Sequence, residues 1–272
     1  MRETFNRQLT ELRQELVSVY ATIDLALHDA VDALVEGDKA KAKNVKALTR
    51  ALDERCAELE DKAFLLIATQ QPVAGDLRLI KFVIFANFNL ARMSNHVRNI
   101  AKTAKRCSGK DVPGQLLDLL ASEGHLVYRV LSGCVTAIVE EDLRQAVSLP
   151  TLDEPVDDLY RQFFRTLATL GPDDDMDAAS RVVMASRMLE RISDNAVEVG
   201  ERLVTLLTGK RRSLDDLADL DDEDLEGLLA TRGAGQLAGR FVDESLARQI
   251  PEVTIEKTDG VSEGDDDGNG AE

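Results

Sequence analysis

The stretch DLRLIKFVIFANFNLARMSNHVRNIAKTAKR, residues 76–106, decides the fold. Its apolar residues recur mostly at steps of three and four, which is the spacing of one face of an α-helix. The same spacing returns 99 residues later, in residues 177–207. The pairs related by this shift are Val83 and Val182, Leu90 and Leu189, Met93 and Ile192, Val97 and Ala196, Ile100 and Val199, and Ala104 and Leu203. The sequence therefore predicts a duplicated helix with one apolar seam in each copy.

Helical spacing continues on both sides of each copy. The predicted helices cover residues 3–36, 39–70 and 76–106 in the first half, and residues 114–140, 142–170 and 177–207 in the second half. The fifth of these is expected to be interrupted near Pro150 and Pro155, because proline breaks helical hydrogen bonding. We therefore predict an all-α fold, a tandem repeat of two antiparallel three-helix bundles, over residues 1–110 and 111–211. Residues 212–272 are expected to form an acidic, largely flexible tail.

The net charge of -17 is concentrated in that tail. Residues 212–272 contain 18 Asp and Glu against 5 Lys and Arg, whereas residues 1–211 contain 32 acids against 28 bases. The body is only mildly acidic, so adaptation of the whole surface to high salt has weak support. Aromatic residues make up 4% of the chain, and a surface that lacks both positive charge and stacking platforms disfavours direct nucleic acid binding.

Membrane and redox signals are absent from the sequence. No apolar run approaches the roughly 18 residues that a membrane-spanning helix needs. The start, MRETFNRQLTELRQEL, lacks the apolar stretch and cleavage site of a secretory signal, so we expect a cytoplasmic location and no membrane insertion. Cys56, Cys107 and Cys134 form no C-x-x-C pair, and we interpret them as small buried side chains.

Two pairs of acids in the second half are the sharpest chemical feature. Glu190 and Asp194 are four residues apart, which places both carboxylates on one face of their helix. Asp153 and Asp157 have the same spacing on the preceding helix. Antiparallel packing would bring the four carboxylates together, and such a cluster favours a hard cation such as magnesium, calcium or manganese, or carboxylate-held iron. The alternative is that nearby arginines, residues 187 and 191, neutralise these acids on a solvated face.

A basic cluster ends the helix predicted over residues 76–106. Cations at a helix C-terminus interact favourably with the helix dipole, which accounts for the cluster without any ligand. The functional alternative is docking of an anionic surface, such as the chain's own tail. The candidate partner-binding residues are Arg92, Arg98, Lys102, Lys105 and Arg106, followed by Lys110.

Catalytic signatures are missing. The histidines at positions 28, 96 and 125 form no ligand-spaced pair, and no glycine-rich phosphate loop is present. A nucleophilic triad cannot be assembled from these residues, so we predict that the chain is not an enzyme.

The tail supports two interpretations. Residues 213–229 have the pattern of a short acidic amphipathic helix, and residues 263–272, EGDDDGNGAE, have too little apolar surface to order. Because its charge is opposite to that of the basic cluster, we expect the tail to tune partner binding or to inhibit it. A purely solubilising tail is the alternative.

Two motifs in this helical duplication resemble the PhoU phosphate-uptake regulators. They are ELEDKAFLLIATQQPVAGDLR at residues 58–78 and LERISDNAVEVGERL at residues 189–203, and the resemblance covers roughly residues 5–210. It implies two PhoU-type three-helix bundles in a non-catalytic cytoplasmic protein that often forms a dimer. It also implies negative control of phosphate uptake and homeostasis, through contact with a phosphate ABC transporter (its ATPase component) or a phosphate-signalling protein.

The resemblance further implies metal bound by paired acidic motifs, one pair in each repeat. Asp153, Asp157, Glu190 and Asp194 match the motifs of the second repeat. In the first repeat the expected acids are replaced at Thr49, Ala91 and Asn95, leaving Asp53. We therefore expect at most one metal centre, a divalent or iron-type metal in the second repeat. Pro155 inside the second-repeat motif suggests that residues 153–155 start a helix.

Three functions remain open at this level. A regulator of phosphate uptake is the leading hypothesis, supported by the duplication and the two motifs. A metal-binding or metal-sensing helical bundle would use the clustered carboxylates directly. A structural adaptor would tolerate loss of Glu190 and Asp194 without consequence.

Overall fold

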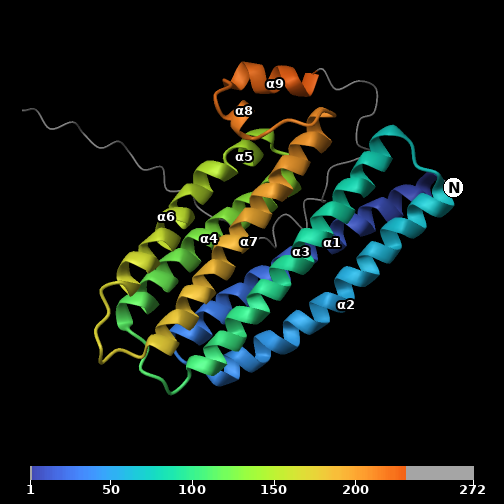
Figure 1. Cartoon of the computed structure of the whole chain (residues 1–272). Helices are drawn as coiled ribbons and strands as arrows, with labels where there is room; N and C mark the ends of the chain where they lie inside the picture. The colour runs from blue at the N-terminus through green and yellow to red at the C-terminus, as the bar shows by residue number, and fades with distance from the viewer. Residues whose placement is uncertain (1, 231–272) are drawn as a thin grey trace, which may run out of the picture.

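Nine helices make up the part of the chain that the computed structural model describes, residues 2–230 (Figure 1). In chain order they are α1 (Arg2–Val35), α2 (Lys39–Gln70), α3 (Ala74–Cys107), α4 (Gly114–Glu140), α5 (Leu143–Val147), α6 (Leu149–Leu167), α7 (Met176–Thr208), α8 (Asp215–Ala218) and α9 (Asp222–Ala230). No strand occurs in residues 2–230, and the prediction of an all-α tandem repeat is confirmed.

Local sequence signals set the turns between the first three helices. The chain leaves α1 through Gly37 with a φ of 71°, a conformation that glycine adopts without strain. Asp38 then caps α2, its side chain accepting hydrogen bonds from the backbone N–H groups of Ala40 at 2.7 Å and Lys41 at 3.0 Å. The helix ends at Gln70, with Gln71 in the left-handed conformation and then Pro72, which has no N–H to continue the hydrogen-bond pattern.

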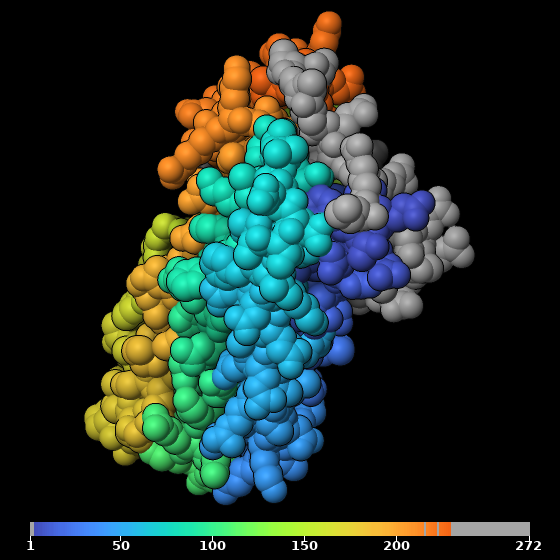
Figure 2. All heavy atoms as spheres, turned by 90° about the vertical axis from the view of Figure 1, so that its right-hand side faces the viewer, coloured from blue at the N-terminus to red at the C-terminus, as the bar shows by residue number. Residues whose placement is uncertain are grey.

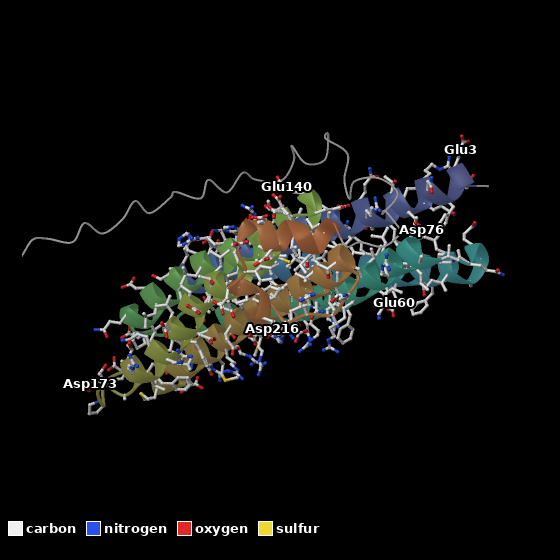
Figure 3. The ribbon with its side chains drawn as sticks, turned by 90° about the horizontal axis from the view of Figure 1, so that it is seen from above. Glu3, Glu60, Asp76, Glu140, Asp173 and Asp216 are labelled. Atoms are coloured by element: carbon white, nitrogen blue, oxygen red, sulfur yellow. The ribbon has the colours of Figure 1, made fainter. Side chains whose placement is uncertain are left out.

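Two groups of three long helices share one continuous hydrophobic core. In the first repeat α1, α2 and α3 pack on one another, and in the second α4, α6 and α7 do the same. The groups meet where α3 lies along α7 and α1 lies along α4 (Figure 1). Figure 2 shows α2 running the length of one face of the molecule. Asp173, in the loop before α7, lies at the opposite end of the molecule from Glu3 (Figure 3).

The duplicated apolar seam is buried in both copies. Every one of the paired residues in α3 and α7, from Val83 to Ala104 and from Val182 to Leu203, is at most 1% exposed. Full burial of a valine, leucine or isoleucine side chain contributes roughly 1.5–3 kcal/mol. The seam that indicated the repeat is thus also what joins the two repeats, because α3 and α7 pack against each other.

The fifth predicted helix is divided into α5 and α6 at Ser148. Pro150 lies in the first turn of α6, where its missing N–H has no helical partner to lose. The expectation that residues 153–155 start a helix is wrong: α6 starts at Leu149 and contains Pro155 in its interior. Proline there removes one helical hydrogen bond, and the burial of Val156, which is 0% exposed, holds the segment in place.

The start of the predicted flexible tail packs on the body instead. Leu214 and Leu217 around α8 and Leu225 in α9 are buried, with exposed fractions of 1%, 0% and 6%. Arg144 of α5 pairs with Glu226 at 3.8 Å, a surface contact between α5 and α9. The sequence pattern did not predict that residues 214–225 pack on the body, because a short run of leucines buries little apolar surface by itself. These leucines are buried only against the surface that α5 and α7 provide. The rest of the tail, residues 231–272, lies outside the described residues.

Candidate functional site

The four acids singled out in the sequence lie on two helices that pack together, α6 and α7. Burial raises the pKa of Asp153 to about 6, and the carboxylates of Asp194 and Asp157 add to that rise. Burial likewise raises the pKa of Glu190, with Asp194 contributing, and the pKa of Asp194, with Asp157 contributing. Each carboxylate therefore experiences the charge of at least one other member, and the four form one acidic cluster.

Arginines on the same helices pair with three members of this acidic cluster. Arg187 contacts Glu190 at 3.1 Å. Arg191 contacts Glu190 at 3.6 Å and Asp194 at 3.4 Å. On α6, Arg161 contacts Asp157 at 3.6 Å, although both of these side chains are largely exposed. Residues 187 and 191 thus supply counter-charge to the α7 acids, as the alternative interpretation of the sequence expected.

Two oxygens in the cluster are buried and have no hydrogen-bond donor within normal distance, Asp153 Oδ1 and Glu190 Oε2. The nearest positive charge to Glu190 Oε2 is Arg191 Nε, 3.6 Å away. The Glu190 side chain is only 12% exposed, so water reaches it poorly. An unpartnered buried oxygen costs roughly 1–3 kcal/mol, more when the group is charged. The cluster is therefore incompletely hydrogen-bonded, although arginines pair with three of its four members.

The residue types of the acidic cluster suit a metal ion, but the arrangement of their side chains does not. Carboxylate oxygens suit hard cations, and two of them are buried without a hydrogen bond. Within residues 2–230, however, no three side chains from His, Cys, Asp and Glu converge in a way that could hold a metal ion. Arginine guanidinium groups, among them those of Arg187 and Arg191, supply positive charge at the cluster. A cation would have to draw the carboxylates away from them.

A helix of the first repeat also reaches this site. Arg92 of α3 lines a cavity of about 300 Å³ together with Asp153, Arg191, Asp194 and Asn195. The cavity lies where α3 packs along α7, at the junction of the two repeats. The acidic cluster is thus open to solvent on the side that faces the first repeat.

The five candidate partner-binding cations divide between two sides of α3. Arg92 lines the cavity with α7, while Arg98 turns to α2 and binds Asp53. Lys102 donates to Asn99 Oδ1 at 2.9 Å. Lys105 and Arg106 are exposed in the last turn of α3. Four of the five are therefore on the surface, and Arg98, whose side chain is 17% exposed, serves as an internal link.

The equivalent positions of the first repeat hold no acidic cluster. Arg98 donates to the carbonyl oxygen of Thr49 at 2.8 Å, to Thr49 Oγ1 at 3.2 Å and to Asp53 Oδ2 at 2.5 Å. Ala91 and Asn95 stand where the second repeat has Glu190 and Asp194. One arginine and one acid thus link α2 to α3 where the second repeat gathers four acids.

Sequence reasoning missed a buried acid beside the cluster. Glu123 of α4 is 0% exposed, and the polar side chain beside its carboxyl is Ser186 of α7. Burial raises its pKa well above the usual value, the Ser186 hydroxyl opposes the rise, and the nearby charge of Glu190 adds to it. The sequence pattern predicts this burial, because Leu116, Leu120, Glu123 and Val127 follow steps of four, three and four on the apolar face of α4.

Taken together, the fold and the site define a class of protein, a tandem three-helix repeat with an acidic cluster confined to its second copy. A family model described as the PhoU domain matches the chain twice, at residues 16–104 and 120–203. These two matches fall on α1–α3 and on α4–α7 and together cover more than half of the chain. The chain belongs to the PhoU domain family.

Curated relatives agree with this assignment. The chain is 33% identical over 208 residues to the phosphate-specific transport system accessory protein PhoU homolog 1 of Methanothermobacter thermautotrophicus, covering 75% of this chain and 94% of that protein. It is 31% identical over 210 residues to the homolog 1 of Mycobacterium leprae, covering 77% of this chain and 95% of that protein. The second match to the family model ends at residue 203, before the acidic tail begins.

Solved structures share the fold. PhoU from Pseudomonas aeruginosa superposes with a TM-score of 0.72 at 24% identity, over 76% of this chain and 100% of that one. The phosphate transport system regulatory protein PhoU from Streptococcus pneumoniae gives a TM-score of 0.70 at 23% identity, over 77% of this chain and 99% of that one. At this identity the likeness supports the architecture alone.

Proposed function

We propose that this chain is a non-catalytic regulator of phosphate uptake that works by contact with another protein. The observation that carries the proposal is family membership through both repeats, with relatives named as accessory proteins of a phosphate-specific transport system. The proposed partner is the ATPase component of a phosphate ABC transporter or a phosphate-signalling protein. Signal transduction would then consist of binding and release, with no reaction on the chain itself.

The proposed contact face is formed by α3 and α7. It contains the outer side of the acidic cluster, where the side chain of Asp194 is 39% exposed. Beside it on α3 are Arg92 and Phe88, the latter 61% exposed and apolar. A surface that combines both signs of charge with an exposed aromatic residue is typical of protein contacts, in which charge sets orientation and the apolar group adds affinity.

The direct test is recovery of the partner. Tagged full-length chain is used to capture proteins from phosphate-replete cells, and a phosphate transporter or phosphate-signalling component is the expected product. The double variant Glu190→Ala and Asp194→Ala should reduce recovery about tenfold, because it removes charge from the contact face. Glu54→Ala with Glu58→Ala, exposed acids four residues apart on α2, is the matched control and should bind normally.

Loss of function in cells gives a second readout. Deletion of the chain is expected to derepress phosphate uptake when phosphate is plentiful. Unchanged uptake, together with a capture experiment that yields no component of phosphate transport or signalling, would reject the proposal. Normal capture by the α7 double variant would reject only the proposed face.

A metal-binding or metal-sensing bundle is the second candidate function. The specific observation in its favour is the pair of buried oxygens without a hydrogen bond, Asp153 Oδ1 and Glu190 Oε2. The proposed ligands remain Asp153, Asp157, Glu190 and Asp194, which would hold a divalent or iron-type ion after their separation from arginine. The bound ion would supply positive charge to this acidic face.

Elemental analysis and calorimetry decide between the candidates. Protein purified without chelators is expected to contain at most one metal ion per chain, and Mn²⁺ titrated into the apo protein should bind less well to Asp153→Asn with Asp194→Asn. Asp53→Asn in the first repeat is the matched control. A metal-free protein that still captures its partner would remove the metal-based function and leave the regulator intact.

Location and assembly complete the proposal. We place the regulator in the cytoplasm as a homodimer, which would let one molecule contact two partner subunits. Of the helices in residues 2–230, none has the length and apolar character to cross a bilayer. Sedimentation equilibrium tests the assembly state, and a mass of one chain at micromolar concentration would contradict the dimer.

A further inference from the structure

A histidine and a methionine meet across the junction of the two repeats. His96 of α3 and Met188 of α7 approach each other with Nδ1 and Sδ 3.2 Å apart, where α3 packs along α7. Both side chains are half-buried. Thioether sulfur is a weak hydrogen-bond acceptor, so an N–H···S contact by itself adds little to stability. The junction therefore holds an imidazole nitrogen and a sulfur together without a strong hydrogen bond between them.

A second methionine extends this pair on its open side. Met184 comes one turn before Met188 on α7, so the two side chains lie on the same face of the helix. Met184 is 55% exposed. A methionine side chain has three rotatable bonds, which lets its sulfur turn toward a neighbouring group. One nitrogen and two sulfurs can thus reach a common point that is accessible to solvent.

The distance between the nitrogen and the sulfur suits a shared metal ion. Metal ions of the size of zinc bind imidazole nitrogen at about 2.0–2.1 Å and sulfur at about 2.3 Å. At bond angles of about 90–110° these lengths place the two donor atoms roughly 3.1–3.6 Å apart. The 3.2 Å between His96 Nδ1 and Met188 Sδ lies within that range. An ion can therefore bind both atoms without a movement of α3 relative to α7.

The imidazole is in the protonation state that binds metals. Burial lowers the pKa of His96, and the positive charges of Arg92 and Arg191 lower it further. His96 is therefore neutral at pH 7, which is the form of histidine that coordinates a metal. Arg191 is itself paired with Glu190 and Asp194. The charge of the exposed Arg92 disfavours a divalent ion beside the imidazole more than a monovalent one.

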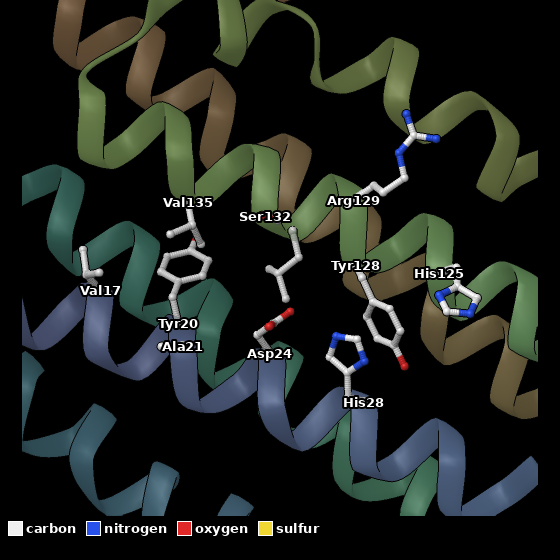
Figure 4. Close-up of a pocket in the computed structure, with 11 residues that line it drawn as sticks. Val17, Tyr20, Ala21, Asp24, His28, His125, Tyr128, Arg129, Ser132 and Val135 are labelled. Atoms are coloured by element: carbon white, nitrogen blue, oxygen red, sulfur yellow. The ribbon is translucent and has the colours of Figure 1, made fainter. Parts of the chain in front are cut away.

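The other two histidines of the chain have aromatic neighbours instead. His28 of α1 stacks on Tyr128 of α4, with ring centres 3.5 Å apart and planes 24° apart (Figure 4). His125 meets the same ring edge-on, with centres 5.9 Å apart. Both histidines line a hollow of about 340 Å³ between α1 and α4. The contact with sulfur thus distinguishes His96, and the exposed His125 is a suitable control for it.

The cysteines compete poorly for a soft metal ion. Cys56, Cys107 and Cys134 are all buried. Burial raises the pKa of Cys56 to about 11 and that of Cys134 to about 12, and it also raises the pKa of Cys107. Because the thiolate is the form that binds metals, these thiols are poor ligands at pH 7. Thioether sulfur is therefore the sulfur ligand that the surface at α3 and α7 offers.

We propose that His96, Met188 and Met184 form a binding site for Cu⁺ that joins the two repeats. Thioether sulfur selects soft ions such as Cu⁺, and imidazole suits copper, whereas hard cations prefer carboxylates. The site lies one turn along each helix from the cavity lined by Arg92 and Arg191, so it is separate from the acidic cluster. The bound ion ties α3 to α7 beside the proposed contact face. The site does not depend on the regulatory function proposed above.

Competition for Cu⁺ tests the site in the full-length chain. Cu⁺ is titrated without oxygen against the chromophoric chelator bicinchoninate, and one ion per chain is expected. Met188→Leu is a swap of similar volume that cores tolerate well. It should weaken binding at least about tenfold, because loss of a group that only supports a metal ligand already costs about 10–100-fold.

Two matched controls accompany this variant. Met176→Leu changes an exposed methionine at the start of the same helix, and His125→Gln changes an exposed histidine of the second repeat. Both should bind Cu⁺ as the wild type does. Absence of binding to the wild type, or equal affinity of the wild type and Met188→Leu, would overturn the proposal.

NMR of labelled methionine methyl groups identifies the ligands. Ag⁺, a soft monovalent ion that keeps its oxidation state, is added to chain that carries ¹³C in these methyl groups. The signals of Met184 and Met188 should shift, while those of the buried Met93 and the exposed Met176 should stay in place. Binding of Ag⁺ that leaves the Met184 and Met188 signals unchanged would place the ion on other groups, such as the thiols, and would overturn the proposal.

A pair of variants separates this site from the acidic cluster. Asp153→Asn with Asp194→Asn should weaken any binding of Mn²⁺ and leave the affinity for Cu⁺ unchanged. Met184→Leu with Met188→Leu should weaken binding of Cu⁺ and leave Mn²⁺ unaffected. If the carboxylate variant loses Cu⁺ as strongly as the methionine variant, the ion belongs to the acidic cluster and the proposal is wrong.

Discussion

Equivalent positions in the two repeats carry different charged contacts. In the first repeat a single acid, Asp53, is bound by Arg98, which also donates to the carbonyl of Thr49 at 2.8 Å. In the second repeat four acids gather on α6 and α7, and Arg187 and Arg191 pair with only part of them. The same helical frame therefore supports both a hydrogen-bonded link and a concentrated negative charge.

The difference indicates which of the two positions is built for stability. The first-repeat link leaves the Asp53 side chain 46% exposed, so its charge is hydrated as well as paired. The acidic cluster instead keeps buried oxygens without hydrogen bonds and carboxylates with raised pKa values. Groups held in an unfavourable electrostatic state are more common at functional sites than at purely structural ones. The second repeat is accordingly where we expect binding.

The largest expected effect comes from removing counter-charge in the second repeat. Arg187→Ala with Arg191→Ala leaves Glu190, which is 12% exposed, without its two arginine partners. We expect a loss of about 2–3 kcal/mol in the free energy of unfolding at pH 7, below the 3–5 kcal/mol typical of a fully buried pair. Urea unfolding followed by circular dichroism measures it.

The first repeat supplies the comparison for this experiment. Arg98→Ala should cost about 1 kcal/mol, because Asp53 remains hydrated after losing its partner. The second-repeat loss should also shrink at pH 5, since carboxylates with raised pKa values take up protons there. If both variants lose the same free energy of unfolding at every pH, the acids of the second repeat depend on their arginines no more than Asp53 depends on Arg98.

Glu123 provides the next largest effect. Its raised pKa means that the folded state favours the protonated acid, so its contribution to stability is full below the unfolded pKa and is lost as the pH rises through the folded pKa. Glu123→Gln removes that loss and should raise the free energy of unfolding by about 1–2 kcal/mol at pH 8. Denaturant unfolding at pH 5 and pH 8 compares the two chains. Glu54→Gln on exposed α2 is the control, and a destabilised Glu123→Gln chain at pH 8 would contradict the argument.

Asp153 should show a smaller dependence of the same sign. Its folded-state pKa of about 6 lies above the unfolded value, so stability is lost as the pH rises through 6. Asp153→Asn should flatten the stability profile between pH 4 and pH 7 and gain about 1 kcal/mol at pH 7 after allowance for screening by solvent. A proton titration by NMR of the Asp153 carboxyl checks the cause directly. Asp53→Asn is the control, and a midpoint near pH 4 would remove the explanation.

The fold was predictable because each repeat contains its own periodic seam. The 99-residue shift identified positions that the structure buries almost completely, such as Leu90 and Leu189. Two details were missed because they depend on tertiary support. Pro155 is tolerated inside α6 since Val156 is buried on the neighbouring helices, and the leucines from Leu214 to Leu225 order only on the surface of α5 and α7.

The candidate site was predictable in composition but not in geometry. Residue spacing identified the paired acids and the flanking arginines, because positions three and four apart share a helical face. It could not show that Arg92 of the first repeat lines the same cavity, since that contact depends on how α3 packs along α7. Glu123 was overlooked although its place among Leu120 and Val127 on the apolar face marked it as buried.

The smallest expected effect comes from rebuilding the acids in the first repeat. Ala91→Glu with Asn95→Asp restores the charge pattern of Glu190 and Asp194, and Arg92 and Arg98 lie three residues to either side of position 95. Ion pairs at that spacing offset the added repulsion, so the free energy of unfolding should change by less than about 0.5 kcal/mol. Thermal unfolding would then shift by no more than about 2 °C. A loss in the free energy of unfolding as large as that of the second-repeat arginine variant would mean that the first repeat cannot accommodate a second and third acid. The absence of acids there would then protect stability. A negligible shift would instead mean that the frame tolerates the charge, so the confinement of the acidic cluster to the second repeat reflects what the cluster binds.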